Sequence, residues 1–292
     1  MEYMEFLGRI RDLLNERYSD VTVSVHSTVK NNGVVLSGLS FSKKGYNASP
    51  TIYMENYYSD YVEGEDVADI ADRIMSLYRE NDMAAQVDMS FFDDFEHVKD
   101  RLFIKLINKE KNSDFLKGSP YEDFLDLAIV PYVRVCDKKI GNGIIMVRNE
   151  HLALWKTDAK KVLAAAKKNT HDHDGYNIRH IMDVLDGLGV CDKEGLGEKE
   201  FPMYVATNSR KINGAAVLTM NDKLKEFSAI IGGDYYIIPS SVHELILLGK
   251  RDDSACNIDE MIRDVNRTEL GPDDVLADHA YVYVQSDEVL IF

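Results

Sequence analysis

The segment Val21–Ser42, VTVSVHSTVKNNGVVLSGLSFS, decides the fold class of the N-terminal part of this chain. Val21, Val23 and Val25 alternate with polar residues, and the alternation returns after the turn residues Asn31-Asn32-Gly33. A period of two residues is typical of a strand with one buried face, and Asn-Gly favours a tight turn. The segment therefore predicts a β-hairpin.

Helical periodicity surrounds this hairpin. Apolar residues recur at helical spacing over residues 3–18 and again over 65–78, and the spacing also predicts a third helix over 94–112. Residues 125–135 are apolar enough for a strand, in which Pro131 cannot donate a ladder hydrogen bond. We therefore expect this strand at a sheet edge or a bulge.

The second half of the chain changes from helices to short strands. Residues 150–188 predict a helical middle segment, and the glycine- and charge-rich residues 191–200 predict a linker between domains at 1–190 and 201–292. Beyond it, strands are expected at 203–207, 215–220, 235–238, 242–248, 280–284 and 289–292, with two helices between them. The sequence thus predicts an α+β fold, with antiparallel or mixed sheets covered on one face by helices.

Composition and charge limit the classes of function. The 292 residues carry a formal net charge of −16, and a field of this sign repels phosphate backbones, so we expect no binding to generic nucleic acid. The charge leaves three interpretations open: solubility, docking on a basic protein partner, or mimicry of nucleic acid.

Targeting and redox features agree with a cytoplasmic location. The N-terminus lacks the basic stretch and apolar run of a secretory signal, and no apolar segment approaches the length that spans a bilayer. The three cysteines, Cys136, Cys191 and Cys256, are widely spaced, which argues against a disulfide framework. We therefore expect reduced thiols and no association with membranes.

No strong motif for a cofactor is present. The sequence contains no phosphate-binding glycine loop and no paired Cys-x-x-Cys, so no cofactor is expected. The densest polar cluster is His171-Asp172-His173-Asp174. Imidazole and carboxylate suit a divalent metal, but adjacent ligands in one turn rarely converge on a single ion. A hydrated turn between helices is the simpler interpretation.

One strand junction combines the groups needed for acid–base or nucleophilic chemistry. Ser240-Ser241-Val242-His243-Glu244 follows the predicted strand 235–238, and Asp278-His279 precedes the strand 280–284. If these segments meet at one end of the sheet, a hydroxyl, an imidazole and a carboxylate share a site. The alternative is that the same side chains satisfy buried backbone groups and fix strand register.

Eight phrases along the chain resemble a bacterial family known as domain of unknown function 5688. They are Lys30–Val34, Ser49–Tyr53, Asp94–Arg101, Lys105–Asn108, Phe124–Val130, His151–Trp155, Pro239–Glu244 and Asp278–Tyr281. The resemblance implies a bacterial, mainly clostridial origin and agrees with a cytoplasmic protein, but it implies no reaction. The chain departs from the family pattern at His171–Asp174, where the resemblance predicts a turn with proline and leucine.

Two functions follow as expectations. The first is an accessory or interaction protein that works through a macromolecular partner, because motifs for catalysis are absent and the chain is strongly acidic. The second is a hydrolase or other acid–base enzyme with its site at Ser240–Glu244 and Asp278–His279.

Overall fold

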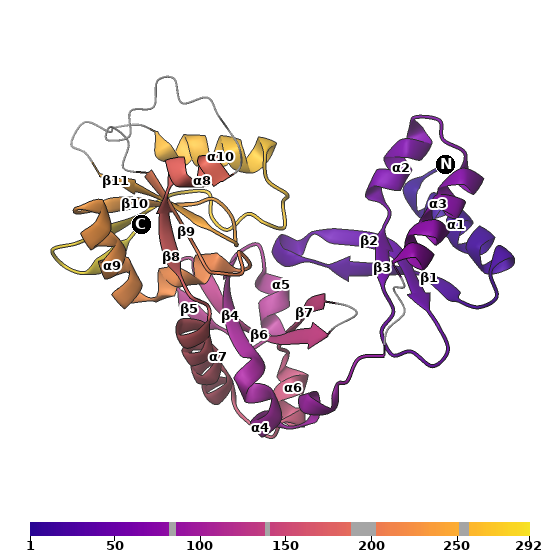
Figure 1. The fold of residues 1–292 in the computed structure, drawn as a ribbon, viewed down its shortest axis with the longest axis horizontal. Helices are drawn as coiled ribbons and strands as arrows, with labels where there is room; N and C mark the ends of the chain where they lie inside the picture. Colours follow the sequence, from indigo (N-terminus) through magenta and orange to yellow (C-terminus); the bar gives the residue numbers. More distant parts are fainter. Residues whose placement is uncertain (82–85, 138–140, 188–202, 251–256) are drawn as a thin grey trace. The chain divides into compact units, whose positions relative to one another are not determined.

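The computed structural model describes residues 1–81, 86–137, 141–187, 203–250 and 257–292. The chain divides into two compact units, one formed by 1–92 with 135–143 and the other by 93–134 with 144–292. Figure 1 shows the elements of both units, and each unit is described by itself.

The N-terminal unit is a three-stranded antiparallel sheet with helices packed on one face (Figure 1). Its elements are α1 (Tyr3–Arg17), β1 (Thr22–Val29), β2 (Val35–Ser42), β3 (Thr51–Tyr53), α2 (Glu55–Val62) and α3 (Val67–Glu80), in the sheet order β1-β2-β3. The predicted hairpin is confirmed, because β1 and β2 pair continuously from Thr22↔Ser42 to Val29↔Val35.

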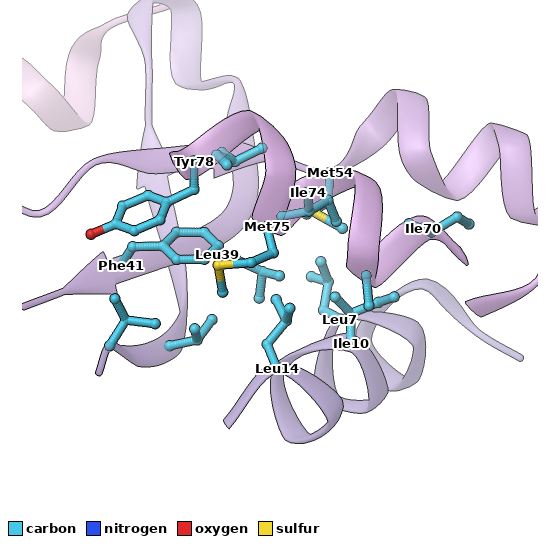
Figure 2. Close-up of a cluster of buried hydrophobic side chains, with 14 of the residues drawn as sticks. Leu7, Ile10, Leu14, Leu39, Phe41, Met54, Ile70, Ile74, Met75 and Tyr78 are labelled. Atoms are coloured by element: carbon cyan, nitrogen blue, oxygen red, sulfur yellow. The ribbon is translucent and has the colours of Figure 1, made fainter. Parts of the chain in front are cut away.

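The core of this unit lies between the sheet and two helices. Leu7, Ile10 and Leu14 of α1 and Ile70, Ile74 and Met75 of α3 form one buried cluster with Leu39 and Phe41 of β2 (Figure 2). Phe41 stacks on Tyr78 of α3 with ring centroids 4.7 Å apart. Helical spacing of three and four residues places each apolar set on one helix face, so both helices bury that face against the strands.

The second unit begins where the sequence predicted a long helix over 94–112, and this prediction is wrong. Only α4 (Phe95–Val98) and a turn of 3-10 helix (Lys99–Arg101) form, and β4 (Leu102–Asn108) follows. Every residue of β4 is buried. A continuous apolar run contains helix-spaced residues by default, so periodicity alone cannot separate a buried strand from a helix.

A four-stranded sheet is built around β6 (Leu127–Asp137). It pairs antiparallel with β4 and with β5 (Glu122–Phe124), and also pairs with β7 (Gly141–Met146), while α5 (Ser113–Lys117) lies between β4 and β5 in sequence. Of the two expected positions, the sheet edge is wrong, because β6 has neighbours on both sides, and the pairing of β6 with β4 runs through Pro131 without a bulge. Pro131 is tolerated because it lies beyond the last residue paired with β5, Ile129, and its carbonyl accepts from Val147 N–H.

The predicted helical middle segment is confirmed in outline. It comprises α6 (Asn149–Leu154), α7 (Ala159–His173) and α8 (Ile181–Gly187), with one short strand, β8 (Asn177–His180), before α8. Ile178 was expected in a helix but lies in β8, because β8 pairs with β9 (Met203–Thr207).

The C-terminal part is a six-stranded sheet in the order β13-β12-β10-β11-β9-β8, with antiparallel neighbours. The other elements here are α9 (Asn221–Ile231), β10 (Tyr235–Pro239), β11 (Leu245–Gly249), α10 (Ile258–Thr268), β12 (Tyr281–Val284) and β13 (Val289–Ile291). The strand expected at 215–220 is instead a buried 3-10 helix, Gly214–Thr219. Its short apolar run fits either structure.

Helices cover both faces of this sheet, where one face was expected. Ile238 packs against Ile258 and Ile262 of α10, while the Tyr235 hydroxyl donates to the carbonyl of Leu224 in α9. Because Tyr235 and Ile238 are three residues apart on one strand, they point to opposite faces. The predicted linker 191–200 lies outside the described residues, so the predicted domain boundary stays a prediction.

Candidate functional site

The predicted site segments lie at one end of the six-stranded sheet. Pro239 at the end of β10 pairs with Leu245 at the start of β11, and Ile237 pairs with Tyr281 at the start of β12. Residues 240–244 and 278–279 therefore emerge from the same end of the sheet. β10 separates β11 from β12, however, and the two segments use different partners.

His243 is held by backbone groups on one side and a carboxylate on the other. Its Nδ1 accepts from Asn213 N–H at 3.1 Å, and its Nε2 lies 3.3 Å from Asp274 Oδ1. Its own N–H donates to Ser241 Oγ at 3.0 Å, and its carbonyl accepts from the Thr207 hydroxyl at 2.8 Å. An acceptor role at Nδ1 places the ring proton on Nε2, facing Asp274.

A glycine makes the close approach of this loop possible. A Cβ on Gly214 would lie 2.4 Å from the carbonyl oxygen of His243 and 2.4 Å from Thr207 Oγ1. Asn213 before it has the left-handed conformation, with φ 56°. Asparagine tolerates this region better than most residues, and only glycine fits the next position. The turn at Asn213-Gly214 thus places Asn213 N–H within hydrogen-bond distance of His243.

Lys105 of β4 adds a nearly buried amine that interacts electrostatically with the same carboxylate. Only 9% of the surface of Lys105 is exposed. Burial lowers the pKa of Lys105 from 10.5 to about 8, and the nearby charges of Asp274 and Asp273 act in the opposite direction. Within the described ranges, Asn213 Nδ2 is also buried without a hydrogen-bond partner. His243, Asp274, Asn213 and Lys105 are called the His243 group below.

A second group forms around Asp126, in the turn between β5 and β6. Asp126 Oδ1 accepts from the Tyr281 hydroxyl at 2.7 Å, and Oδ2 lies 3.1 Å from His279 Nε2. The other ring nitrogen of His279 lies 3.0 Å from the carbonyl of Ala280. Burial lowers the pKa of His279, but the Ala280 carbonyl and Asp126 raise it, and the net direction is upward.

The remaining predicted residues have structural partners or line a cavity. Asp278 accepts from Lys111 Nζ at 3.0 Å and from Asn266 Nδ2 at 2.9 Å. Ser241 N–H donates to the Glu244 carbonyl at 3.2 Å, which closes the loop. Ser240 lines a cavity of about 110 Å³ beside α10.

This cavity is apolar and lies between α10 and the strand ends. Its lining residues are Met203, Ile238, Pro239, Ser240, Ile246, Met261, Ile262, Val265 and Asn266. Met261 and Val265 are also 48% and 43% exposed, so apolar surface continues from the cavity onto the helix. A volume of this size holds one apolar side chain, but not a drug-sized ligand.

His171–Asp174 lie at the end of α7 and have separate partners. His171 Nε2 lies 2.9 Å from Asp222, Asp172 accepts from Lys168 at 2.6 Å, and His173 is exposed. Asp174 is buried and lies 2.5 Å from Arg134 Nη2. Among residues with a described position, no three metal-binding side chains are placed to share an ion.

Three members of the His243 group had no functional assignment in the sequence. Lys105 lay within the helix predicted over 94–112, and Asn213 lay between the strands predicted at 203–207 and 215–220. A lysine inside a run of apolar, β-branched residues is the one sequence feature that could have indicated a buried amine.

The geometry describes an α+β protein whose polar clusters lie at sheet ends, and the comparisons place it in a family. The chain belongs to the family of unknown function DUF5688, whose model matches residues 3–285. No curated protein and no solved structure matches the chain. No helix in the described ranges is long and apolar enough to cross a membrane.

Proposed function

We propose that this chain is an interaction protein that works through a protein partner, and that the partner inserts an apolar side chain beside α10. The cavity of about 110 Å³, continuous with exposed Met261 and Val265, is the observation on which this proposal rests. Apolar pockets with a polar rim are typical of the central contacts in protein interfaces.

The charge around the cavity indicates the chemistry of the partner. Residues 258–279 contain seven acidic residues and two arginines, Arg263 and Arg267. Both arginines have acceptors nearby, because Arg267 pairs with Asp264 at 2.9 Å and Arg263 Nη1 lies 3.5 Å from the Asp278 carbonyl. The surplus of carboxylates favours a partner segment with basic residues on either side of its apolar anchor.

Affinity capture with matched variants tests this proposal. Val265→Glu places a charge at the cavity wall, while Ile230→Glu places the same charge on α9, where Ile230 is 50% exposed and does not line the cavity. We expect the parent chain and Ile230→Glu to capture the same protein, and we expect Val265→Glu not to capture it. Calorimetry with that purified partner should then show affinity weakened by at least about tenfold, because a charge in an apolar contact is desolvated. Unchanged capture by Val265→Glu would contradict the proposal.

An acid–base enzyme is the second candidate. One observation favours it: the Asp274 carboxylate lies 3.3 Å from His243 Nε2 and interacts electrostatically with the nearly buried amine of Lys105. Titratable groups with perturbed pKa values are enriched in active sites. The hydrogen bond from Asn213 to Nδ1 weighs against it, because that ring nitrogen is already occupied.

A further inference from the structure

Strand β1 forms an open edge of the N-terminal sheet. The sheet order β1-β2-β3 leaves one side of β1 without a neighbouring strand in the described part of the chain (Figure 1). β1 is eight residues long, contains no proline and no Asp, Glu, Lys or Arg, and pairs with β2 without a bulge. Natural edge strands usually carry a proline, a charged residue or a bulge, because an edge strand without these features pairs with other chains.

The hydrogen bonds of Asn15 identify which backbone groups point outward. Its side-chain amide donates to the Val23 carbonyl and accepts from Val23 N–H, each at 2.8 Å. Asn15 thus occupies the position of a neighbouring strand at Val23. Outward groups alternate along a strand, so Val25, Ser27 and Val29 also direct their N–H and C=O to this edge. Lys30 agrees with this alternation, because its N–H points inward to the Val34 carbonyl.

The open part of the edge is limited at both ends and is symmetric. Asn15 closes it at Val23, and the turn at Asn31–Gly33, with φ 59° at Asn32, closes it after Val29. The segment between these limits is Val25-His26-Ser27-Thr28-Val29, with a valine at each end and Ser27 at its centre. The backbone N–H and C=O groups of these three residues point outward. A two-fold antiparallel pairing centred on Ser27 places Val25 opposite Val29 of the second copy, so a valine meets a valine at both ends of the segment.

We propose that the partner of this edge is a second copy of the chain, which adds its own β1 antiparallel and joins the two three-stranded sheets. Ser27 then faces Ser27 of the second copy, and Val25 faces Val29 in a pair that exchanges both backbone hydrogen bonds. Val29 is 66% exposed in the single chain, and this pairing covers it with an apolar side chain. No charged residue lies within the paired segment to oppose its two-fold counterpart.

The net charge of the chain predicts how dimerisation depends on ionic strength. Two chains that each carry −16 repel one another, and the strand contact itself is uncharged. Added salt screens the repulsion and leaves the strand pairing intact, so the dimer should strengthen with ionic strength. An interface based on ion pairs would weaken instead.

Sedimentation of the full chain over a range of concentrations tests the dimer. We expect Val29→Lys to weaken dimerisation by at least about tenfold, because it adds like charges at an edge contact. Val62→Lys is the matched control, since Val62 is 67% exposed on α2 and carries the same charge change away from β1. A monomer at every concentration and salt, or equal effects of both variants, would overturn the proposal.

Cysteine cross-linking tests the register. In a pair of this type the Cα atoms lie about 5.5 Å apart, within disulfide reach, so Ser27→Cys should form linked dimers under mild oxidation. Ser24→Cys should not, because Ser24 faces Lys30 of the second copy in this register. The native cysteines are common to both variants and to the parent, which sets the background. Linkage through Ser24→Cys at the same yield would refute this pairing.

Discussion

The Nε2 of His279 lies 3.1 Å from Asp126 Oδ2, and the same ring presents Nδ1 to the Ala280 carbonyl at 3.0 Å. Both facing atoms are acceptors, so the ring satisfies both only when both nitrogens carry protons. The protonated ring of His279 can therefore connect the start of β12 to the turn before β6 through both nitrogens. This contact depends on pH.

We expect His279→Gln to destabilise the chain more at pH 6 than at pH 9. Because the pKa of His279 is raised in the folded state, its stabilisation is fully present below the unfolded value of about 6.5 and is lost as pH rises through the higher folded value. Urea unfolding of parent and variant across this range measures the difference. Asp126→Asn should reduce the pH dependence, while the Ala280 carbonyl still raises the pKa of His279. An equal loss of stability in His279→Gln at both pH values would contradict the assignment.

Lys105→Met should stabilise the chain near neutral pH. The folded-state pKa of about 8 lies below the ordinary value of 10.5, so burying the ammonium costs up to about 3 kcal/mol at pH 7. This cost falls as pH rises from about 8 toward 10.5, since the folded chain then holds the neutral amine. Denaturation at pH 7 and pH 10 checks both statements. Lys105→Arg, which keeps the charge, should show no gain.

Breaking the buried pair of Arg134 and Asp174 should be costly. Both side chains are buried, their charged atoms lie 2.5 Å apart, and the guanidinium carbon lies 3.3 Å from the ring centroid of Phe103. Asp174→Asn alone should cost about 3–5 kcal/mol, because it leaves an uncompensated buried charge. The double variant Arg134→Met with Asp174→Leu should lose less than the two single variants combined. Additive losses in a denaturation cycle would contradict coupling.

The sequence predicted elements with clear periodicity and failed where apolar runs had none. The hairpin at 22–42 alternates strictly, and the structure confirms it residue by residue. Leu102–Asn108 and Gly214–Thr219 are buried throughout most of their length, so no polar face was available to distinguish strand, helix and 3-10 helix. Both errors concern elements whose form is set by tertiary neighbours.

The partners within the candidate site could not be read from the sequence for a related reason. Asp126 lies 153 positions before His279, and Asp274 lies 31 positions after His243, so each pair depends on the sheet order. The sequence indicated that Asp278 and His279 could lie at the same sheet end as His243. It had no means of predicting that β10 would lie between β11 and β12.

Limited proteolysis should cut first within 189–200, and the two fragments should remain together. The expectation of cleavage follows from the glycine- and charge-rich composition of this interval. The expectation of association follows from β8, before the interval, which pairs with β9 after it, and from Asp174, whose carbonyl accepts from Ser209. Size-exclusion chromatography of the nicked chain checks this. Fragments that separate without denaturant would support two independent domains at 1–190 and 201–292.

Substitutions at His243 should distinguish a structural from a catalytic imidazole. His243→Ala leaves the partly buried N–H of Asn213 without its acceptor, which should cost about 1–3 kcal/mol of stability. His243→Asn places an amide oxygen near the position of Nδ1 and should restore much of that stability, while His243→Gln places its amide toward Asp274 and should not. Thermal unfolding of the three variants measures this order.

If His243 is instead a general base, His243→Ala should melt close to the parent, and a cellular or enzymatic activity should fall by a factor on the order of 10²–10⁴. We expect the structural result, because the ring nitrogen that accepts from Asn213 and the carbonyl that accepts from Thr207 both fix the loop beside Gly214. A stable His243→Ala variant that loses its phenotype would make the His243 group an active site.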